Sequence, residues 1–184
     1  MLEMTCRRVT VFATAILSGV TAVHAQDVVR TPLPDGNPFP ISAAVTVPAG
    51  YDTVYVSGAL PSVINKEAPK GSVEAYGDMA TQAESALTNI KASLARLGLG
   101  MGDVVKMTVF MVADPTKENK LDFAGLMAAY TKFFATPEQP NKPARSAVQV
   151  AALVAPGALV EIEAVAVKPH QGSIHKGRTH KGEH

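Results

Sequence analysis

Three charged residues near the C-terminal end of the sequence, Arg145, Glu161 and Glu163, have side chains that could do chemistry. The two glutamates share one face of a largely apolar run, where a carboxylate without a partner is costly. The nearest cation along the sequence is Arg145. The residues alone leave two interpretations open. These groups form either a structural ion pair that ties two strands together or a charged site that binds a ligand.

The composition of the main body, residues 26–169, limits the kinds of catalytic site that the protein could have. Residues 26–169 contain neither cysteine nor histidine. A Ser/His/Asp or Cys/His nucleophilic site cannot be built there, and neither can a zinc site of the usual His/Cys type. Any catalysis should rest on positioning, hydrogen bonding and a carboxylate. The same body carries 12 basic and 14 acidic residues without a basic run, which argues against a nucleic-acid partner.

Period-two runs predict the strands that would position these charges. Residues 145–150 and 159–167 alternate on either side of a Pro-Gly turn, which predicts two strands. Residues 42–47 and 51–57 predict a hairpin. Residues 103–112 are apolar on both sides, so we expect a strand inside its sheet.

Two amphipathic helices are predicted between these strands. Apolar residues at steps of three and four indicate a helix over residues 78–97 that ends before Gly98. A second helix is predicted over about residues 122–134, with an inner face of Phe123, Leu126, Met127, Tyr130 and Phe134. The order of elements predicts an α+β domain with a single sheet and both helices on one side. The uncovered face of that sheet predicts oligomerisation.

The N-terminal segment, residues 1–25, reads as a secretory signal peptide. Two arginines precede a short apolar run that ends in a small-x-small site before Gln26. The alternative is an N-terminal membrane anchor, which the shortness of the run disfavours. Cleavage would remove Cys6, the one cysteine of the chain, and would make the protein periplasmic or secreted.

Two further segments lie outside the expected domain, residues 37–169. Residues 26–36 are polar and carry prolines, so we interpret them as a linker. The tail, residues 170–184, holds four histidines separated by glycines. Such a tail could chelate a soft divalent ion. Glycine spacing leaves nothing to preorganise the ligands, so we expect a disordered tail without a metal site.

The stretch PARSAVQVAAL followed by PGALVEIEAVAV resembles the signature of the RidA/YjgF family of enamine and imine deaminases. The resemblance covers roughly residues 37–168. It implies a chorismate mutase-like fold with a mixed sheet, and a homotrimer whose active sites lie between subunits. Family members hydrolyse 2-enamine and 2-imine acids, such as 2-aminoacrylate and 2-iminopropanoate, to the 2-keto acid and ammonia. That chemistry requires no metal, flavin or pyridoxal cofactor.

The resemblance also implies roles for individual residues. Arg145 matches the family arginine that grips the substrate carboxylate, a task that suits its planar fork of donors. Glu161 matches the carboxylate that orients or activates the attacking water. Ser57 and Gly58 would present a hydroxyl and an unobstructed backbone N–H to the ligand. Phe39 stands where the family usually has a tyrosine that helps to place the substrate or water.

Three other positions depart from the family pattern and make the expected pocket more apolar. Ala59 replaces a common Gln, Met127 an Asn, and Ala147 a Cys or Thr. The expected function is hydrolytic deamination of a small imine or enamine carboxylate by an exported protein, with no membrane contact after cleavage. The alternative is a noncatalytic small-carboxylate-binding or chaperone-like protein on the same trimer, which would need Arg145 but not Glu161. RNA cleavage, linked to some members, is disfavoured by the charge balance.

Overall fold

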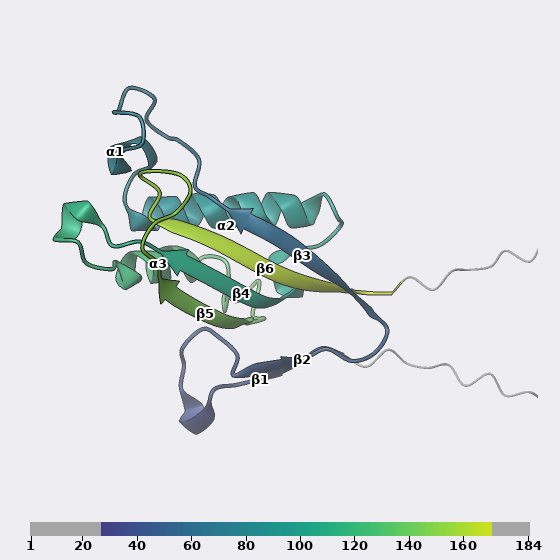
Figure 1. Ribbon diagram of the computed structural model, residues 1–184. Helices are drawn as coiled ribbons and strands as arrows, with labels where there is room; N and C mark the ends of the chain where they lie inside the picture. Colours follow the sequence, from purple (N-terminus) through teal and green to yellow (C-terminus); the bar gives the residue numbers. More distant parts are fainter. Residues whose placement is uncertain (1–26, 171–184) are drawn as a thin grey trace, which may run out of the picture.

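The computed structural model describes residues 27–170, which form one mixed sheet, a small ribbon and two main helices (Figure 1). Four strands make up the sheet in the order β3-β6-β4-β5. Their bounds, in that order, are Tyr51–Ala59, Val160–Pro169, Val104–Met111 and Ala144–Gln149. The expected signal peptide lies outside the described residues, and so does the expected tail apart from His170.

Strand β4 lies inside the sheet, as its two-sided apolar pattern predicts. It pairs in parallel with β5 and antiparallel with β6, and β6 pairs antiparallel with β3 on its other edge. The two runs that flank the Pro-Gly turn become β5 and β6, but β4 separates them. A parallel pair needs a long crossover connection, and the chain makes it between β4 and β5 through α3, Phe123–Tyr130.

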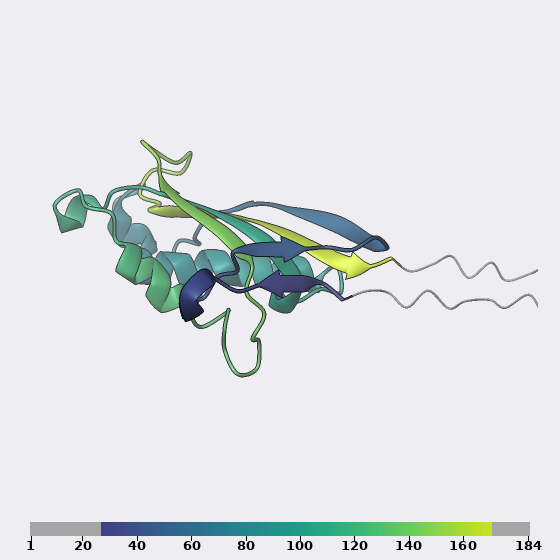
Figure 2. The ribbon, with the colours of Figure 1, turned by 90° about the horizontal axis from the view of Figure 1, so that it is seen from below.

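Both main helices pack on one face of the sheet (Figures 1 and 2). Helix α2, Met79–Ala95, begins after Asp78, whose carboxylate accepts a hydrogen bond from the Thr81 backbone N–H at 2.9 Å. This confirms the helix predicted over residues 78–97. The core lies between the helices and the inward side chains of the strands, among them Met107, Val109, Met111, Ile162 and Ala164. Within residues 27–170, no helix covers the opposite face.

Helix α3 is shorter than the predicted span to residue 134. Its last helical residue is Tyr130, and the chain continues in hydrogen-bonded turns to Ala135, which has a positive φ of 59°. Phe123, predicted on the inner face, is 37% exposed, whereas Leu126 and Phe134 are fully buried. The first residue of the helix thus points its ring away from the core and toward Arg145.

The other helical segments are single turns that join the main elements. They are α1, Val73–Tyr76, and three 3-10 turns, η1, η2 and η3, at Pro34–Gly36, Met101–Asp103 and Pro115–Lys117. No helix among residues 27–170 is long and apolar enough to cross a membrane.

The hairpin predicted from residues 42–47 and 51–57 does not form. Its first strand becomes β2, Ala44–Thr46, which pairs with β1, Val29–Thr31. Its second strand becomes β3 and joins the sheet through β6. Strand β1 lies within residues 26–36, so the segment interpreted as a linker is in part a folded strand.

Arg30 explains why this polar segment belongs to the fold. Its Nη1 donates hydrogen bonds to the backbone oxygens of Val104 at 3.0 Å and Lys142 at 2.9 Å, and its Nη2 donates to that of Gly102 at 2.8 Å. One side chain therefore fastens the β1–β2 ribbon to two segments that are distant in sequence. A composition rich in proline and polar residues gives no sign of such long-range contacts. This is why the sequence alone indicated a linker.

Candidate functional site

The guanidinium of Arg145 lies among three aromatic rings. Its Cζ is 4.3 Å from the ring centroid of Tyr130, 5.4 Å from that of Phe39 and 5.7 Å from that of Phe123. Its Nη1 also lies 3.4 Å from the sulfur of Met127. Within residues 27–170 no carboxylate forms a salt bridge with it. The rings attract the positive charge through their faces, and an anion for the N–H donors must come from elsewhere.

Burial sets the ionisation of this cluster. Removal from water lowers the pKa of Arg145 from its usual value, and the neighbouring Tyr130 partly opposes that effect. Burial also raises the pKa of the Tyr130 phenol far above its usual value, with Arg145 acting in the opposite direction. The phenol therefore stays neutral, and its hydroxyl donates to the backbone oxygen of Pro40 at 3.1 Å. A charged, half-buried arginine without an anionic partner in the described part of the chain is suited to hold a ligand carboxylate.

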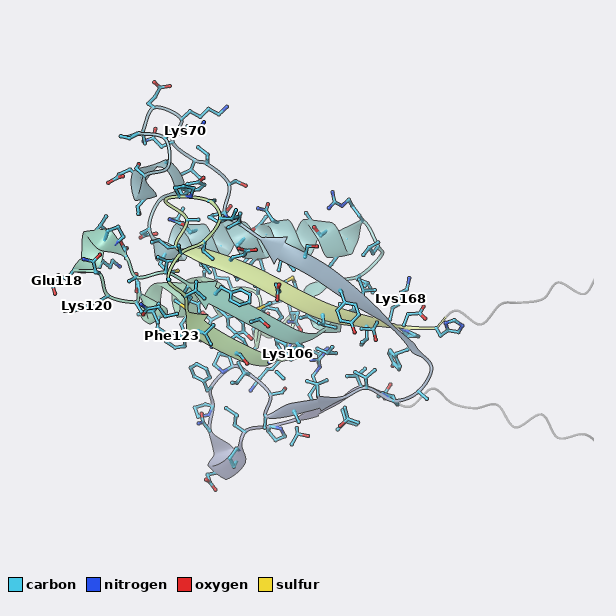
Figure 3. All side chains as sticks on the ribbon, viewed as in Figure 1. Lys70, Lys106, Glu118, Lys120, Phe123 and Lys168 are labelled. Carbon is cyan, nitrogen blue, oxygen red and sulfur yellow. The ribbon has the colours of Figure 1, made fainter. Side chains whose placement is uncertain are left out.

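Three separate parts of the chain build this cluster, because α3 supplies Phe123 and Tyr130. Strand β5 carries Arg145, and the segment between β1 and β2 carries Phe39. That segment is held against β5 by Ser42, whose backbone N–H donates to Pro143 O at 3.0 Å and whose hydroxyl donates to Lys142 O at 2.7 Å. Phe39 and Phe123 are parallel to within 11°, with ring centroids 6.3 Å apart. Phe123, labelled in Figure 3, is the first residue of α3 and brings its ring to Arg145 near the start of β5.

Sequence reasoning missed Phe123 and Tyr130 as neighbours of Arg145. The helical pattern places both on the inner face of the second helix, as core residues. Tyr130 is fully buried, and helical periodicity cannot distinguish a core ring from a ring that also stacks on a cation. Met127 departs from the family pattern, and it does contact Arg145.

Glu161 lies on the opposite face of the sheet. Its neighbours in β6, Val160 and Ile162, are fully buried beneath the helices, so alternation along the strand turns Glu161 to the uncovered face. Across the sheet it pairs with Phe110 of β4. These two residues line a hollow of about 240 Å³ together with the loop after β5, including Val150, Ala152, Leu153 and Val154. In the described part of the chain nothing forms a hydrogen bond or a salt bridge with the Glu161 carboxylate.

The structural ion pair considered from the sequence is therefore absent from residues 27–170, because no salt bridge joins Arg145 to Glu161. The two residues lie on opposite faces of one sheet, and a single chain does not bring them together. Glu163, two residues further along β6, is exposed.

Ser57 and Gly58 lie near the end of β3 and belong with Glu161 rather than with Arg145. A β-carbon at Gly58 would stand only 2.1 Å from Oε1 of Glu161. Both residues are exposed and line a hollow of about 490 Å³ at the edge of β3, which is also lined by Asn89 of α2 and by Arg96, the residue that follows α2. The five predicted site residues thus form two groups: Arg145 with Phe39, and Glu161 with Ser57 and Gly58.

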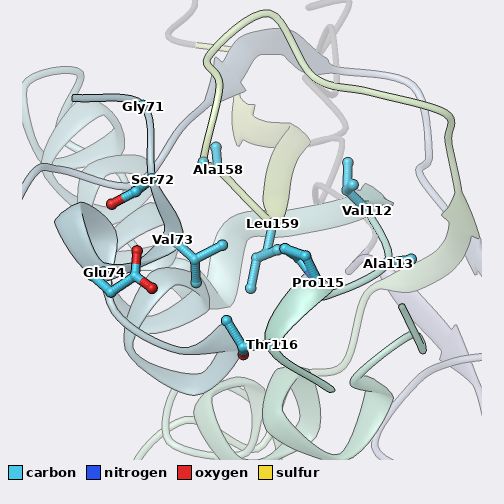
Figure 4. A pocket seen from close by; sticks show the side chains of 11 residues that line it. Gly71, Ser72, Val73, Glu74, Val112, Ala113, Pro115, Thr116, Ala158 and Leu159 are labelled. Atoms are coloured by element: carbon cyan, nitrogen blue, oxygen red, sulfur yellow. The ribbon is translucent and has the colours of Figure 1, made fainter. Parts of the chain in front are cut away.

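A further pocket, of about 480 Å³, lies where β4 ends and β6 begins (Figure 4). Val73, Val112, Pro115 and Leu159 contribute apolar side chains to its wall. None of the five predicted site residues lines this pocket, so it does not contribute to either group. Residues 27–170 hold no cluster of three His, Cys, Asp or Glu side chains that could bind a metal ion. The histidines that follow His170 lie outside the described residues.

Relatives with known names identify the family. The family model described as endoribonuclease L-PSP matches residues 40–168. The chain belongs to this family, the RidA/YjgF family. The 2-iminobutanoate/2-iminopropanoate deaminase of Escherichia coli K12 is 40% identical over 115 residues, which are 62% of this chain and 79% of that protein. The 3-aminoacrylate deaminase RutC of Acinetobacter baylyi is 35% identical over 134 residues, which are 73% of this chain and 94% of that protein.

The fold agrees with that membership. The crystal structure of YyfB from Yersinia pestis, a protein of unknown function in the conserved Rid family, superposes with a TM-score of 0.57 at 26% identity. The match covers 79% of this chain and 100% of that one. The α+β, chorismate mutase-like architecture expected from the sequence is confirmed, with one main mixed sheet and the helices on one of its faces.

Proposed function

We propose that this RidA/YjgF protein hydrolyses small 2-imine and 2-enamine acids to 2-keto acids and ammonia. The observation that carries the proposal is Arg145, a half-buried cation stacked on three aromatic rings with no carboxylate partner in residues 27–170. The relative at 40% identity is named a deaminase of 2-imine acids, and the relative at 35% identity is named a deaminase of 3-aminoacrylate, another small enamine acid. The substrate carboxylate would accept two parallel hydrogen bonds from the guanidinium.

Besides a group that binds the substrate carboxylate, the reaction requires only a positioned water molecule. In the imine form, water adds to the C=N carbon and one of its protons passes to nitrogen. The second proton passes from the new hydroxyl to nitrogen as the C–N bond breaks, which leaves the 2-keto acid and ammonia. An enamine first gains a proton at carbon and loses one from nitrogen to become the imine. The imine carbon is already electrophilic, so holding it beside an oriented water can supply much of the rate. Glu161 is the carboxylate proposed to orient or activate that water.

The opposite placement of Arg145 and Glu161 supports a site made by two copies of the chain. One copy would contribute Arg145 and Phe39, and its neighbour would contribute Glu161, Ser57 and Gly58. Association is also favoured by apolar side chains left exposed on the uncovered face of the sheet, Tyr55 at 81% and Val148 at 44%. We propose the homotrimer of the family resemblance as this assembly, with three sites between subunits.

Export remains part of the proposal. The N-terminal segment, residues 1–25, has the charge, apolar run and cleavage motif of a signal peptide. The mature protein would then meet its imines in the periplasm or outside the cell. Its substrates there would be the 2-imine acids that amino-acid oxidation produces.

A noncatalytic carboxylate binder is the second candidate, and the surroundings of Arg145 favour it. Phe39, Phe123 and Met127 offer the ligand no hydroxyl or amide beside the guanidinium. A binder would keep its affinity for a 2-keto acid after Glu161→Gln, because only Arg145 is needed to hold the carboxylate. A hydrolase would lose rate with the same substitution.

The deciding experiment measures release of 2-keto acid from imines generated in place by an amino-acid oxidase. The chain from Gln26 onward is compared with its Arg145→Ala and Glu161→Gln variants, and with Glu84→Gln on the exposed side of α2 as a control. The proposal expects acceleration by the parent and the control, and loss in the other two. No acceleration of several imines by a folded, oligomeric protein would overturn it and leave the binder.

A further inference from the structure

Among the glycines of residues 27–170, Gly58 lacks a side chain for a reason of space rather than of backbone conformation. Six other glycines have a positive φ, a conformation that L side chains rarely adopt, whereas Gly58 is not among them. Its backbone conformation would therefore accept alanine. The obstacle is space: a β-carbon there would stand 2.1 Å from Oε1, 3.0 Å from Cδ and 3.1 Å from Cγ of Glu161.

A β-bulge creates this close approach. Val56 pairs with Ala164 and Ala59 pairs with Ile162, so three steps along β3 match two steps along β6. Val56 and Ala59 both pack against the core beneath the sheet. The extra residue therefore leaves Ser57 and Gly58 together on the uncovered side, where strict alternation would have turned one of them inward.

The Glu161 side chain fits between this bulge and the neighbouring strand. Gly58 bounds it on the β3 side, and Phe110, its pairing partner on β4, lies on the other. No hydrogen bond to the carboxylate is found among residues 27–170. Packing against Gly58 and Phe110 is thus what holds the carboxylate, while its oxygens stay free to accept from water.

We propose that Gly58 is a positioning residue for Glu161, an inference that rests on the proposed hydrolytic function. The Glu161 carboxylate occupies the space above the α-carbon of Gly58, where a β-carbon would otherwise stand. The sequence resemblance assigned Gly58 to the ligand through an unobstructed N–H, whereas the geometry assigns its missing side chain to the neighbouring carboxylate. A side chain at residue 58 would displace the carboxylate from this position. A shift of about 1 Å in a reacting group can cost about 100-fold in rate.

The substitution Gly58→Ala tests this role without unfolding the protein. The atom that must move is the end of a flexible side chain, so the melting temperature should change little. We expect kcat to fall about 10- to 100-fold with KM nearly unchanged, as expected when a catalytic group loses its position. In the Glu161→Gln background the same substitution should have little further effect, since the carboxylate is already gone.

A matched control is Gly100→Ala. Gly100 has no positive φ, and a β-carbon at this position would have its nearest neighbouring atom 4.0 Å away, so alanine fits and kcat should not change. If Gly58→Ala instead raises KM, or if its effect multiplies with that of Glu161→Gln, Gly58 acts through the ligand or the fold, and the proposal is overturned.

A second measurement is independent of activity. The full chain is labelled with ¹³C at the glutamate side chains and studied by NMR. The resonance of the Glu161 carboxyl carbon is assigned as the one that is lost in Glu161→Gln. Gly58→Ala should shift that resonance, and Gly100→Ala should leave it in place. An unshifted Glu161 resonance in Gly58→Ala would overturn the positioning role even if activity fell. If the resonance shifts but the parent protein has no deaminase activity, the positioning of Glu161 by Gly58 is supported and only the proposed hydrolysis is refuted.

Discussion

Arg145 and Glu161 face opposite sides of the same sheet, although each is one strand away from β4. Arg145 pairs with Met107 of β4, whose side chain is fully buried beneath the helices. Glu161 pairs with Phe110 of the same strand. Positions three apart in a strand lie on opposite faces, so the two functional candidates are separated by the sheet itself. A site that uses both must take them from different copies of the chain.

Complementation between two inactive variants follows from this arrangement. Arg145→Ala and Glu161→Gln should each lack deaminase activity as homo-oligomers. When the two are co-expressed and assemble at random, an interface with an intact arginine and an intact glutamate should form in about one quarter of the sites. The measurement is keto-acid release by the purified mixed oligomer, relative to the parent.

Mixing the two proteins after purification, without dissociating them, provides the control and should give no activity. A mixed oligomer that stays inactive, with both subunits shown to be present by mass spectrometry, would mean that both residues serve the same copy or that one of them is not used.

Arg145→Lys keeps the charge but removes the planar fork and the flat surface that stacks on Tyr130. Because lysine cannot donate two parallel hydrogen bonds to one carboxylate, we expect KM to rise about tenfold or more while the protein remains folded. Steady-state kinetics on one imine acid checks this. A lysine variant with the parent KM would show that the guanidinium geometry is not what binds the substrate.

Arg30→Ala should loosen the N-terminal ribbon. The side chain makes three hydrogen bonds to backbone oxygens, and burial lowers its pKa, with Asp103 opposing that effect. Loss of these bonds should reduce the free energy of unfolding by roughly 2 kcal/mol. Because the ribbon leads to Phe39, the substrate KM should rise as well. Urea denaturation is the first check.

Arg96→Ala is the comparison for that experiment. Arg96 is exposed, and its side chain makes a single hydrogen bond among the described residues, to Ser93, so its removal should change stability by less than about 0.5 kcal/mol. Equal losses in the two variants would contradict an anchoring role for Arg30.

Asp78→Ala should lower stability in a manner that depends on pH. The carboxylate caps α2 by accepting from Thr81, and this hydrogen bond is the main reason that its pKa lies below the usual 3.8. A pKa that is lower in the folded state stabilises the fold above the unfolded value, and that contribution disappears as the pH falls through the folded value. The difference between parent and variant should be about 1 kcal/mol at neutral pH and should shrink below about pH 4.

Denaturation midpoints measured at several pH values check that dependence. Asp78→Asn, which retains a capping oxygen, should stay close to the parent at neutral pH. A gap for Asp78→Ala that is as large at pH 3 as at pH 7 would show that the charge of the cap is not involved.

Local patterns determined much of the fold without any structure. Steps of three and four and a following glycine define α2, because both signals lie within one continuous segment. Two-sided hydrophobicity predicted that β4 lies inside the sheet. The signature around Arg145 and Glu161 was long enough to identify the family, since motif residues are read directly from the chain.

The tertiary structure alone decided which strands pair and which side chains meet. A period of two says that a segment is a strand but not which partner it takes, so β2 could be assigned to β3 although it pairs with β1. The anchoring bonds of Arg30 span more than 70 residues. Stacking of Tyr130 and Phe39 on Arg145, and the contact between Gly58 and Glu161, likewise join distant parts of the chain. The sequence by itself names the reactive groups, and long-range packing determines where each one lies.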